Sequence, residues 1–333
     1  MTADFILFIG LIAIGSFYLL SASRIVLVVY ILFLIGFIIA MRLDPRGEDF
    51  ETYYRYLKAV DGIRFYREIA YFSISYYLYQ LINSEIITFI LMDVLWLYIL
   101  FKTQKEIHKT HGNKDFGLII ILFTSFPLFF GYENIYRQLF AEIFSLYAYI
   151  IRSRSAKKSN MLLLIAILMH NTALLMLPFF IIKHLLNFNL KSRIAVATVV
   201  AIMFCFLLSI AAGVKSGHNT GLDLSLFYFA LFIVGFIVYF AKNKFRPLQF
   251  IAKFPSLYIG AVLFVGLITL KVGATAERMG MYFLVFVLTD LYIYSISVKN
   301  PRKAAFRIGL LLTFSLPVLI FSSSRGYLFF GHN

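Results

Sequence analysis

The sequence is poor in charge. Only 14% of its 333 residues are charged, and its mean hydropathy is +0.86. A soluble domain carries roughly 25% charged residues, so this deficit excludes an ordinary soluble enzyme or binding domain. Acids are the scarcer sign, with 16 Asp and Glu against 31 Lys and Arg and a formal net charge of +15. Basic loops that fix membrane topology explain this balance better than nucleic acid, which we do not expect as a partner.

The sequence also lacks the residues of several common sites. Its single cysteine, Cys205, excludes an internal disulfide and a Cys-based metal site. No Walker A loop, dinucleotide glycine fingerprint, His-Glu-x-x-His pair or G-x-S-x-G elbow is present. We therefore expect a protein that works without a metal or cofactor.

What the sequence does have is long apolar runs. Each is about 16 to 22 residues long, enough to cross ~30 Å of hydrocarbon as a helix. They predict an all-α, polytopic transmembrane bundle of about ten spanning helices, forming a single integral membrane domain over residues 1–333. The first run lacks a basic n-region and a clear cleavage site, so we interpret it as a retained helix and not a signal peptide. The predicted spanning segments are 5–20, 24–41, 86–101, 116–131, 137–151, 194–211, 225–241, 255–271, 279–298 and 305–322.

The charges of the connecting loops predict the topology. Five loops are basic and are assigned to the cytoplasm: 102–114, 152–158, 183–193, 242–253 and 299–307. This assignment is self-consistent only if two further apolar stretches do not cross the membrane.

The first of these stretches is 69–82. It is rich in Tyr and predicts an interfacial or re-entrant helix within a charged outer loop, 42–85. The second, 161–182, predicts a hairpin of two half-helices broken at His170, with Asn171 capping the returning half. A wrongly placed boundary in some other helix is the competing explanation.

The outer loop 42–68 is densely charged, with six acids and six bases. Arg46 precedes a predicted turn, after which Asp49 and Tyr53 share one face if the segment is helical. The loop is either an internally salt-bridged surface or a cap over a polar ligand, and the sequence leaves both open.

Three further features lie where outer loops meet helices. Arg137 and Gln138 open one helix beside Glu133, and Arg278 with Tyr282 opens another. Arginine presents a planar fork of donors suited to phosphate, and a helix N-terminus favours an anion. Arg46, Arg137 and Arg278 are thus available to converge on one multiply charged anion, of which pyrophosphate is the obvious candidate. Arg137 pairing with Glu133 is the structural alternative.

His170 interrupts an otherwise apolar stretch of about twenty residues. It is either a packing residue or a general base. Asp93 and Asp290, inside spanning segments, are expected to pair with polar partners between helices, whereas Glu142 lies one turn below Arg137.

Taken in order, these features resemble a family. Gly47-x-Asp49-x3-Tyr53, Arg137-Gln138-x-x-Ala141, His170 and Arg278-x3-Tyr282 together are similar to the EpsG-like and Wzy-type bacterial polysaccharide (O-antigen) polymerases. The resemblance covers most of the chain. It implies a multi-pass protein of the bacterial cytoplasmic (inner) membrane that joins undecaprenyl-pyrophosphate-linked oligosaccharide repeat units at the periplasmic face. The product would be O-antigen for lipopolysaccharide, capsule or exopolysaccharide, and a chain-length regulator in the same membrane is a candidate partner.

Roles for the residues follow from this glycosyl transfer. Arg137 and Arg278, with Arg46, would stabilise the leaving pyrophosphate without a metal. His170 or Asp49 would accept the proton of the attacking hydroxyl, with Glu133 as a third candidate, and Gln138, Tyr53 and Tyr282 would support the site. The alternatives are an O-antigen ligase, which usually has a large periplasmic loop where 212–224 is short, and a flippase or transporter that makes no bond.

Overall fold

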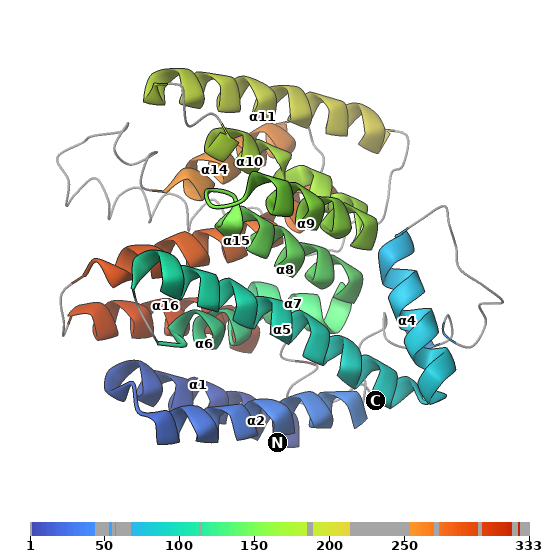
Figure 1. The fold of residues 1–333 in the computed structure, drawn as a ribbon, viewed down its shortest axis with the longest axis vertical. Helices are drawn as coiled ribbons and strands as arrows, with labels where there is room; N and C mark the ends of the chain where they lie inside the picture. Colours follow the sequence, from blue (N-terminus) through green and yellow to red (C-terminus); the bar gives the residue numbers. More distant parts are fainter. Residues whose placement is uncertain are drawn as a thin grey trace. The chain divides into compact units, whose positions relative to one another are not determined.

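The computed structural model describes residues 2–43, 53–54, 57, 68–112, 115–184, 189–213, 254–269, 273–298, 302–321 and 326. Within these ranges every regular element is a helix, which confirms the predicted all-α class (Figure 1). The helices are α1 (Ala3–Ser21), α2 (Arg24–Leu43), α4 (Ile69–Ile82), α5 (Glu85–His111), α6 (Gly117–Phe123), α7 (Phe126–Asn134), α8 (Tyr136–Ile151), α9 (Ala156–Met169), η1 (Asn171–Met176), α10 (Leu177–His184), α11 (Leu190–Gly213), α14 (Pro255–Thr269), α15 (Gly273–Ile296) and α16 (Arg302–Ile320).

The chain forms two compact units. Unit 1 comprises Met1–Ile151, Lys157–Asn171 and Tyr292–Asn333, and unit 2 comprises Arg152–Ala156 and Thr172–Leu291. In unit 2, α11 packs against α14, and α10 contacts both. Asp290 accepts a hydrogen bond from the Ser256 hydroxyl at 2.6 Å there, so it has the polar partner that the sequence led us to expect.

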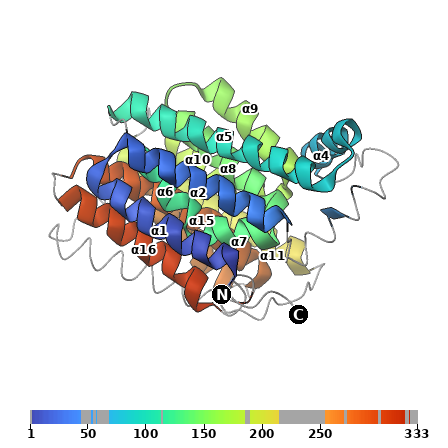
Figure 2. The ribbon, with the colours of Figure 1, turned by 90° about the horizontal axis from the view of Figure 1, so that it is seen from below.

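Unit 1 is built around an antiparallel pair, α1 and α2, with α16 beside α1 (Figures 1 and 2). The turn between α1 and α2 is tight because Ala22 adopts a left-handed φ of 49° and its N–H bonds the Tyr18 carbonyl, closing the last turn of α1. In the same unit, α5 packs against α8.

Within the part of the chain that the structure describes, four helices are long and apolar enough to cross a membrane: α1, α2, α5 and α16. Between 28% and 39% of each of their apolar windows is buried, so most of the apolar surface faces outward. An outward-facing apolar surface of this extent fits a lipid environment. The count of about ten spans is not reached among the described residues, and the predicted segment 225–241 lies outside them.

One predicted spanning segment is not a continuous helix. The stretch 116–131 is not one helix, because it is divided into α6 and α7 at Thr124 and Ser125. Pro127 lies in the first turn of α7, where its missing N–H costs nothing, but it would remove a hydrogen bond from a continuous helix. The hydroxyls of Thr124 and Ser125 donate to carbonyls of α6, which helps to close the first helix.

Two helix ends also differ from expectation. α5 continues to His111, so most of the predicted loop 102–114 is helical. α2 ends at Leu43, which places Arg42 inside a helix and not in the outer loop. The reason is the burial of Arg42 against α5, described below.

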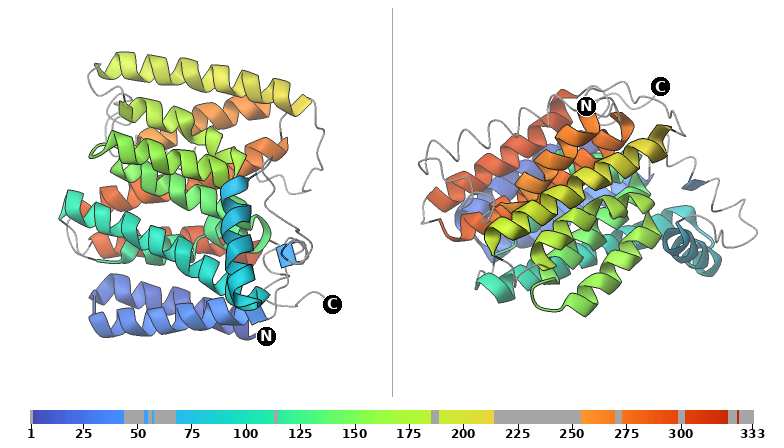
Figure 3. Two further views of the ribbon diagram at one scale, coloured as in Figure 1. Left: turned by 45° about the vertical axis from the view of Figure 1, so that its right-hand side comes forward. Right: turned by 90° about the horizontal axis from the view of Figure 1, so that it is seen from above.

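The Tyr-rich stretch predicted to be interfacial forms α4, with the bounds that the sequence indicates. It packs on α5 and lies across that helix near its N-terminal end, instead of running alongside it (Figures 1 and 3). This transverse course is the one that an interfacial helix would take.

The chain is interrupted at His170, where α9 ends and the 3₁₀ helix η1 begins. The break falls where the sequence placed it. Because η1 and α10 belong largely to unit 2, the return of the chain as a hairpin over 161–182 stays a prediction.

Candidate functional site

A buried ion pair positions the helices around the site. Arg42 of α2 and Asp93 of α5 are both fully buried, and the Nε and Nη2 atoms of Arg42 each donate to the carboxylate at 2.6 Å. The side chains of Trp96, Tyr132 and Tyr136 donate to the same carboxylate at 3.0, 3.3 and 2.6 Å. Charges removed from water persist only with such partners, so the pair ties together α2, α5, α7 and the start of α8.

Arg137 follows directly after the anchored Tyr136. It lies in the first turn of α8, and its side chain is 22% exposed. Its Nε atom donates to the Tyr53 hydroxyl at 3.3 Å, and its Nη1 atom donates to Oε2 of Glu68. The guanidinium also lies 5.3 Å from the Tyr53 ring centroid and 5.6 Å from that of Phe72. Both rings therefore fix its orientation.

His170 reaches the same acid from another helix. Its Nε2 atom lies 3.1 Å from Oε1 of Glu68, and the histidine side chain is 9% exposed. At this distance an imidazole that carries its proton on Nε2 can donate to Oε1 of Glu68, which leaves the ring's lone pair on Nδ1. Two of the residues predicted from the sequence, Arg137 and His170, thus meet on one carboxylate.

The sequence alone does not identify Glu68 as a site residue. Its side chain is 2% exposed, and it precedes α4 with a left-handed φ of 50°. For a non-glycine residue this backbone costs about 1–2 kcal/mol, and such strain gathers at functional sites. In the sequence Glu68 is one of six acids in a charged loop, and nothing local distinguishes it from the other five.

The other predicted site residues lie in α8, in unit 2 or outside the described side chains. Gln138 is 1% exposed in α8, and Tyr282 is fully buried in unit 2, where its hydroxyl lies 2.9 Å from that of Thr172. Arg46 and Asp49 lie outside the described residues. Glu133 in α7 and Arg278 in α15 belong to described helices, but their side chains lie outside the description. The roles of these residues stay predictions.

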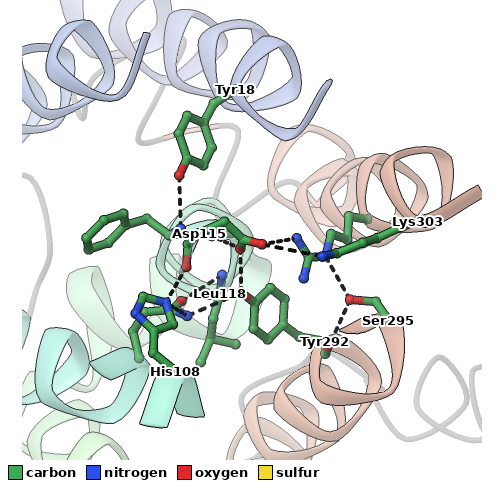
Figure 4. Close-up of polar contacts among 11 residues, drawn as sticks. Tyr18, His108, Asp115, Leu118, Tyr292, Ser295 and Lys303 are labelled. Atoms are coloured by element: carbon green, nitrogen blue, oxygen red, sulfur yellow. Dashed lines mark hydrogen bonds and ion pairs between the residues drawn. The ribbon is translucent and has the colours of Figure 1, made fainter. Parts of the chain in front are cut away.

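A second polar cluster lies around Asp115, between α5 and α6 (Figure 4). Arg307 of α16 donates to Asp115 Oδ2 at 2.7 Å, while Tyr292 donates to Oδ1 at 2.6 Å. Lys303 lies 3.7 Å from Oδ2. Burial raises the pKa of the Asp115 carboxyl, but the charge of Arg307 and hydrogen bonds from Arg307, Tyr292 and the Gly117 amide outweigh it and hold the pKa at about 2.

The two clusters lie at opposite ends of unit 1. Helix α5 connects them. Asp93, in its first half, accepts a hydrogen bond from Tyr136, the residue before Arg137, and its last residue, His111, precedes Asp115 in the chain. Its 27 residues span about 40 Å at 1.5 Å per residue. We refer to these as the Arg137 end and the Asp115 end.

Comparison with known proteins identifies the family of the chain. The model of the EpsG family matches residues 24–330, nearly the whole chain. The chain belongs to the EpsG family. This is a family of Wzy-like polysaccharide polymerases, which confirms the resemblance noted from the sequence. No curated protein and no solved structure matches the chain.

Membership of the EpsG family gives the chain its general role. It supports a polysaccharide-polymerase role of glycosyltransferase type, performed in a membrane on a lipid-linked substrate. Among the described residues no group of three His, Cys, Asp or Glu side chains is placed to hold a metal ion. The match to the EpsG family includes the segments that supply Glu68, Arg137 and His170.

Proposed function

We propose that this EpsG-family protein joins undecaprenyl-pyrophosphate-linked oligosaccharide repeat units at the outer face of the bacterial cytoplasmic membrane. The observation that carries the proposal is the meeting of Arg137 and His170 on Glu68. The guanidinium of Arg137 can bind a diphosphate, and the imidazole of His170 can accept a proton. Glycosyl transfer from a lipid diphosphate needs both functions.

Arg137 would bind the diphosphate of the donor. Its Nε and Nη1 atoms contact Tyr53 and Glu68, while its Nη2 atom has no hydrogen-bond partner among the described residues. The guanidinium is partly exposed, and it stands in the first turn of α8, whose amides and helix dipole add positive character. A cation held in this way needs no rearrangement when charge develops on the leaving group. Arg278 and Arg46 remain proposed as further ligands of the diphosphate.

His170 would accept the proton of the attacking hydroxyl on Nδ1. Glu68 holds the imidazole with Nε2–H toward itself and stabilises the imidazolium that forms, as a carboxylate does behind other catalytic histidines. Asp49 and Glu133 stay as the alternative bases. Glu68 itself is a positioning residue, because it acts through its two neighbours.

The reaction balances without a further reactant. A hydroxyl oxygen of the acceptor unit forms a bond to the anomeric carbon of the growing chain, and the bond from that carbon to the diphosphate oxygen breaks. The hydroxyl proton passes to His170. Undecaprenyl diphosphate leaves with the electron pair, and its charge is matched by Arg137.

The location of the basic residues supports our assignment of the Arg137 end to the outer face of the membrane. The described parts of the predicted basic loops 102–114 and 299–307 are the last turns of α5 and the first turns of α16, at the Asp115 end of unit 1, and the positive-inside rule assigns them to the cytoplasm. The Arg137 end would then face outward, where lipid-linked units are polymerised. The product, whether O-antigen, capsule or exopolysaccharide, is not encoded in these contacts.

The direct test supplies the purified full-length protein in lipid nanodiscs with undecaprenyl-pyrophosphate-linked repeat units. We expect a ladder of polymer on gels, together with released undecaprenyl diphosphate in equal number to the new linkages. Binding of the substrate without release of the carrier would support a flippase or transporter instead. Transfer only to a lipid A core would support a ligase.

A further inference from the structure

A large cavity opens at the Asp115 end of unit 1, far from the proposed catalytic cluster. Its volume is about 860 Å³, within the range of pockets that hold small ligands. It is enclosed by the last turn of α1, by Asp115 and by the first turns of α16. None of these residues takes part in the proposed transfer.

One side of the cavity is charged, and one of the residues that line it has an unsatisfied donor. Lys303, Arg307 and Asp115 line it, so two cations and one carboxylate leave one net positive charge. Arg307 is 3% exposed and uses Nε for Ser295 and Nη1 for Asp115. Its Nη2 atom is buried and has no hydrogen-bond partner among the described residues. A buried guanidinium donor without an acceptor is costly, and a phosphate oxygen would satisfy it.

The other side of the cavity is apolar and open. Leu19, Leu20, Ile308 and Leu312 line it, and Leu312 is 49% exposed on the outward face of α16. A side-chain atom added at Gly309 would meet nothing within 4 Å. The cavity therefore has a charged part beside Asp115 and an apolar part along α16, a helix long enough to cross the membrane.

We propose that this cavity binds an anionic phospholipid. The phosphate, with one negative charge, would lie against Arg307 Nη2 and Lys303 and would neutralise the cavity, while an acyl chain would follow Gly309 and Leu312. Basic pockets between helices on the cytoplasmic side are known to bind anionic head groups, and the positive-inside rule assigns the Asp115 end to that side. The site does not depend on the proposed polymerase chemistry.

The test measures binding of phosphatidylglycerol and phosphatidylcholine to the purified full-length protein by native mass spectrometry. We expect phosphatidylglycerol to bind preferentially. Lys303→Gln should weaken it about fivefold, in line with the contribution of one basic side chain near a lipid head group. The matched control is Lys109→Gln, which removes an exposed lysine of α5 that does not line the cavity, and binding should be unchanged.

A second variant keeps the charges and fills the apolar part of the cavity. Gly309→Leu places a side chain in open space, and leucine is the better helix former, so the protein should remain folded. We expect it to lower phosphatidylglycerol binding at least tenfold. Equal binding of the two lipids, unchanged binding in both variants, competition by water-soluble glycerol phosphate, or binding of undecaprenyl phosphate in place of phosphatidylglycerol would each overturn the proposal.

Discussion

Oε1 of Glu68 lies 3.1 Å from Nε2 of His170, while the other oxygen of the same carboxylate accepts a hydrogen bond from Arg137. Three segments separated by long stretches of sequence thus contribute one acid, one base and one cation. The use that we propose for this arrangement in an EpsG-family protein makes specific predictions about single side chains.

Replacing Arg137 by Lys should abolish long polymer. Lysine keeps the charge but loses the planar fork that contacts Tyr53 and Glu68 and presents a further donor. Loss of one donor to a developing oxyanion lowers the rate about 10²- to 10³-fold. Polymer length on gels, normalised to the amount of protein in the membrane, measures the effect. Arg154→Lys, at an exposed turn beyond the other end of α8, is the control and should leave polymer length unchanged.

Replacing Glu68 by Gln should also strongly reduce polymerisation. Glutamine keeps the size but removes the charge that stabilises an imidazolium at His170, and a catalytic histidine without its carboxylate loses up to about 10⁴ in rate. Glu68→Asp should recover part of the activity, because it restores the charge at a shorter reach. Glu106→Gln, which alters a buried acid in the C-terminal half of α5, should have little effect. If Glu68→Gln were as active as the unaltered protein, Glu68 would be only a structural residue.

Replacing Asp93 by Asn should destabilise unit 1 by about 3–5 kcal/mol, because it leaves the fully buried Arg42 without its counter-charge. The midpoint of thermal unfolding in detergent measures this loss. The double variant Arg42→Met with Asp93→Leu should be more stable than Asp93→Asn, since it removes both charges together. A double variant less stable than the single one would contradict this account.

The stability of the Asp115 end should depend on acid pH. The folded state holds the pKa of Asp115 at about 2, below its ordinary value of 3.8. The stabilisation is therefore fully present above about pH 4 and is lost as the pH falls from 4 to 2, and it amounts to about 2 kcal/mol. Thermal midpoints measured across this range should fall more steeply for the unaltered protein than for Asp115→Asn.

The accessibility of introduced cysteines should show which end of unit 1 faces the cytoplasm. In a Cys205→Ser background, Tyr77→Cys on the exposed side of α4 should react with an impermeant reagent in intact spheroplasts. Lys109→Cys at the Asp115 end should react only after permeabilisation, because that end is assigned to the cytoplasm. Asn187→Cys tests the hairpin over 161–182, which predicts protection in intact spheroplasts. The reverse pattern at Tyr77 and Lys109 would place the proposed site on the wrong face.

The sequence predicts three of the long apolar helices and the break at His170 well, but it does not predict the break at Thr124 and Ser125. Segments 5–20, 24–41 and 305–322 each lie within three residues of the bounds of α1, α2 and α16. Apolar length is enough for these, because a membrane span needs a fixed number of apolar residues. The division of 116–131 is different, since it depends on one proline and two hydroxyl side chains that a hydropathy average does not register.

The candidate site shows the same limit. Arg137 and His170 are recognisable by residue type and by their position at helix ends, and the structure joins them through Glu68. Their connection through Glu68 is tertiary, because it requires the start of α4, the start of α8 and the end of α9 to converge. Likewise, a polar partner for Asp93 can be expected from its burial, but the choice of Arg42 is made only by the packing of α2 on α5.

The sharing of one carboxylate means that Arg137 and His170 are not independent parts. Any change that shifts the left-handed turn at Glu68 would alter the proposed anion ligand, Arg137, and the proposed base, His170, in a single step. Substitutions at positions 137 and 170 should therefore be epistatic, with the second loss smaller once the first has occurred. For anyone who wishes to redesign this polymerase, the turn before α4 is the one place where both halves of the chemistry can be retuned together.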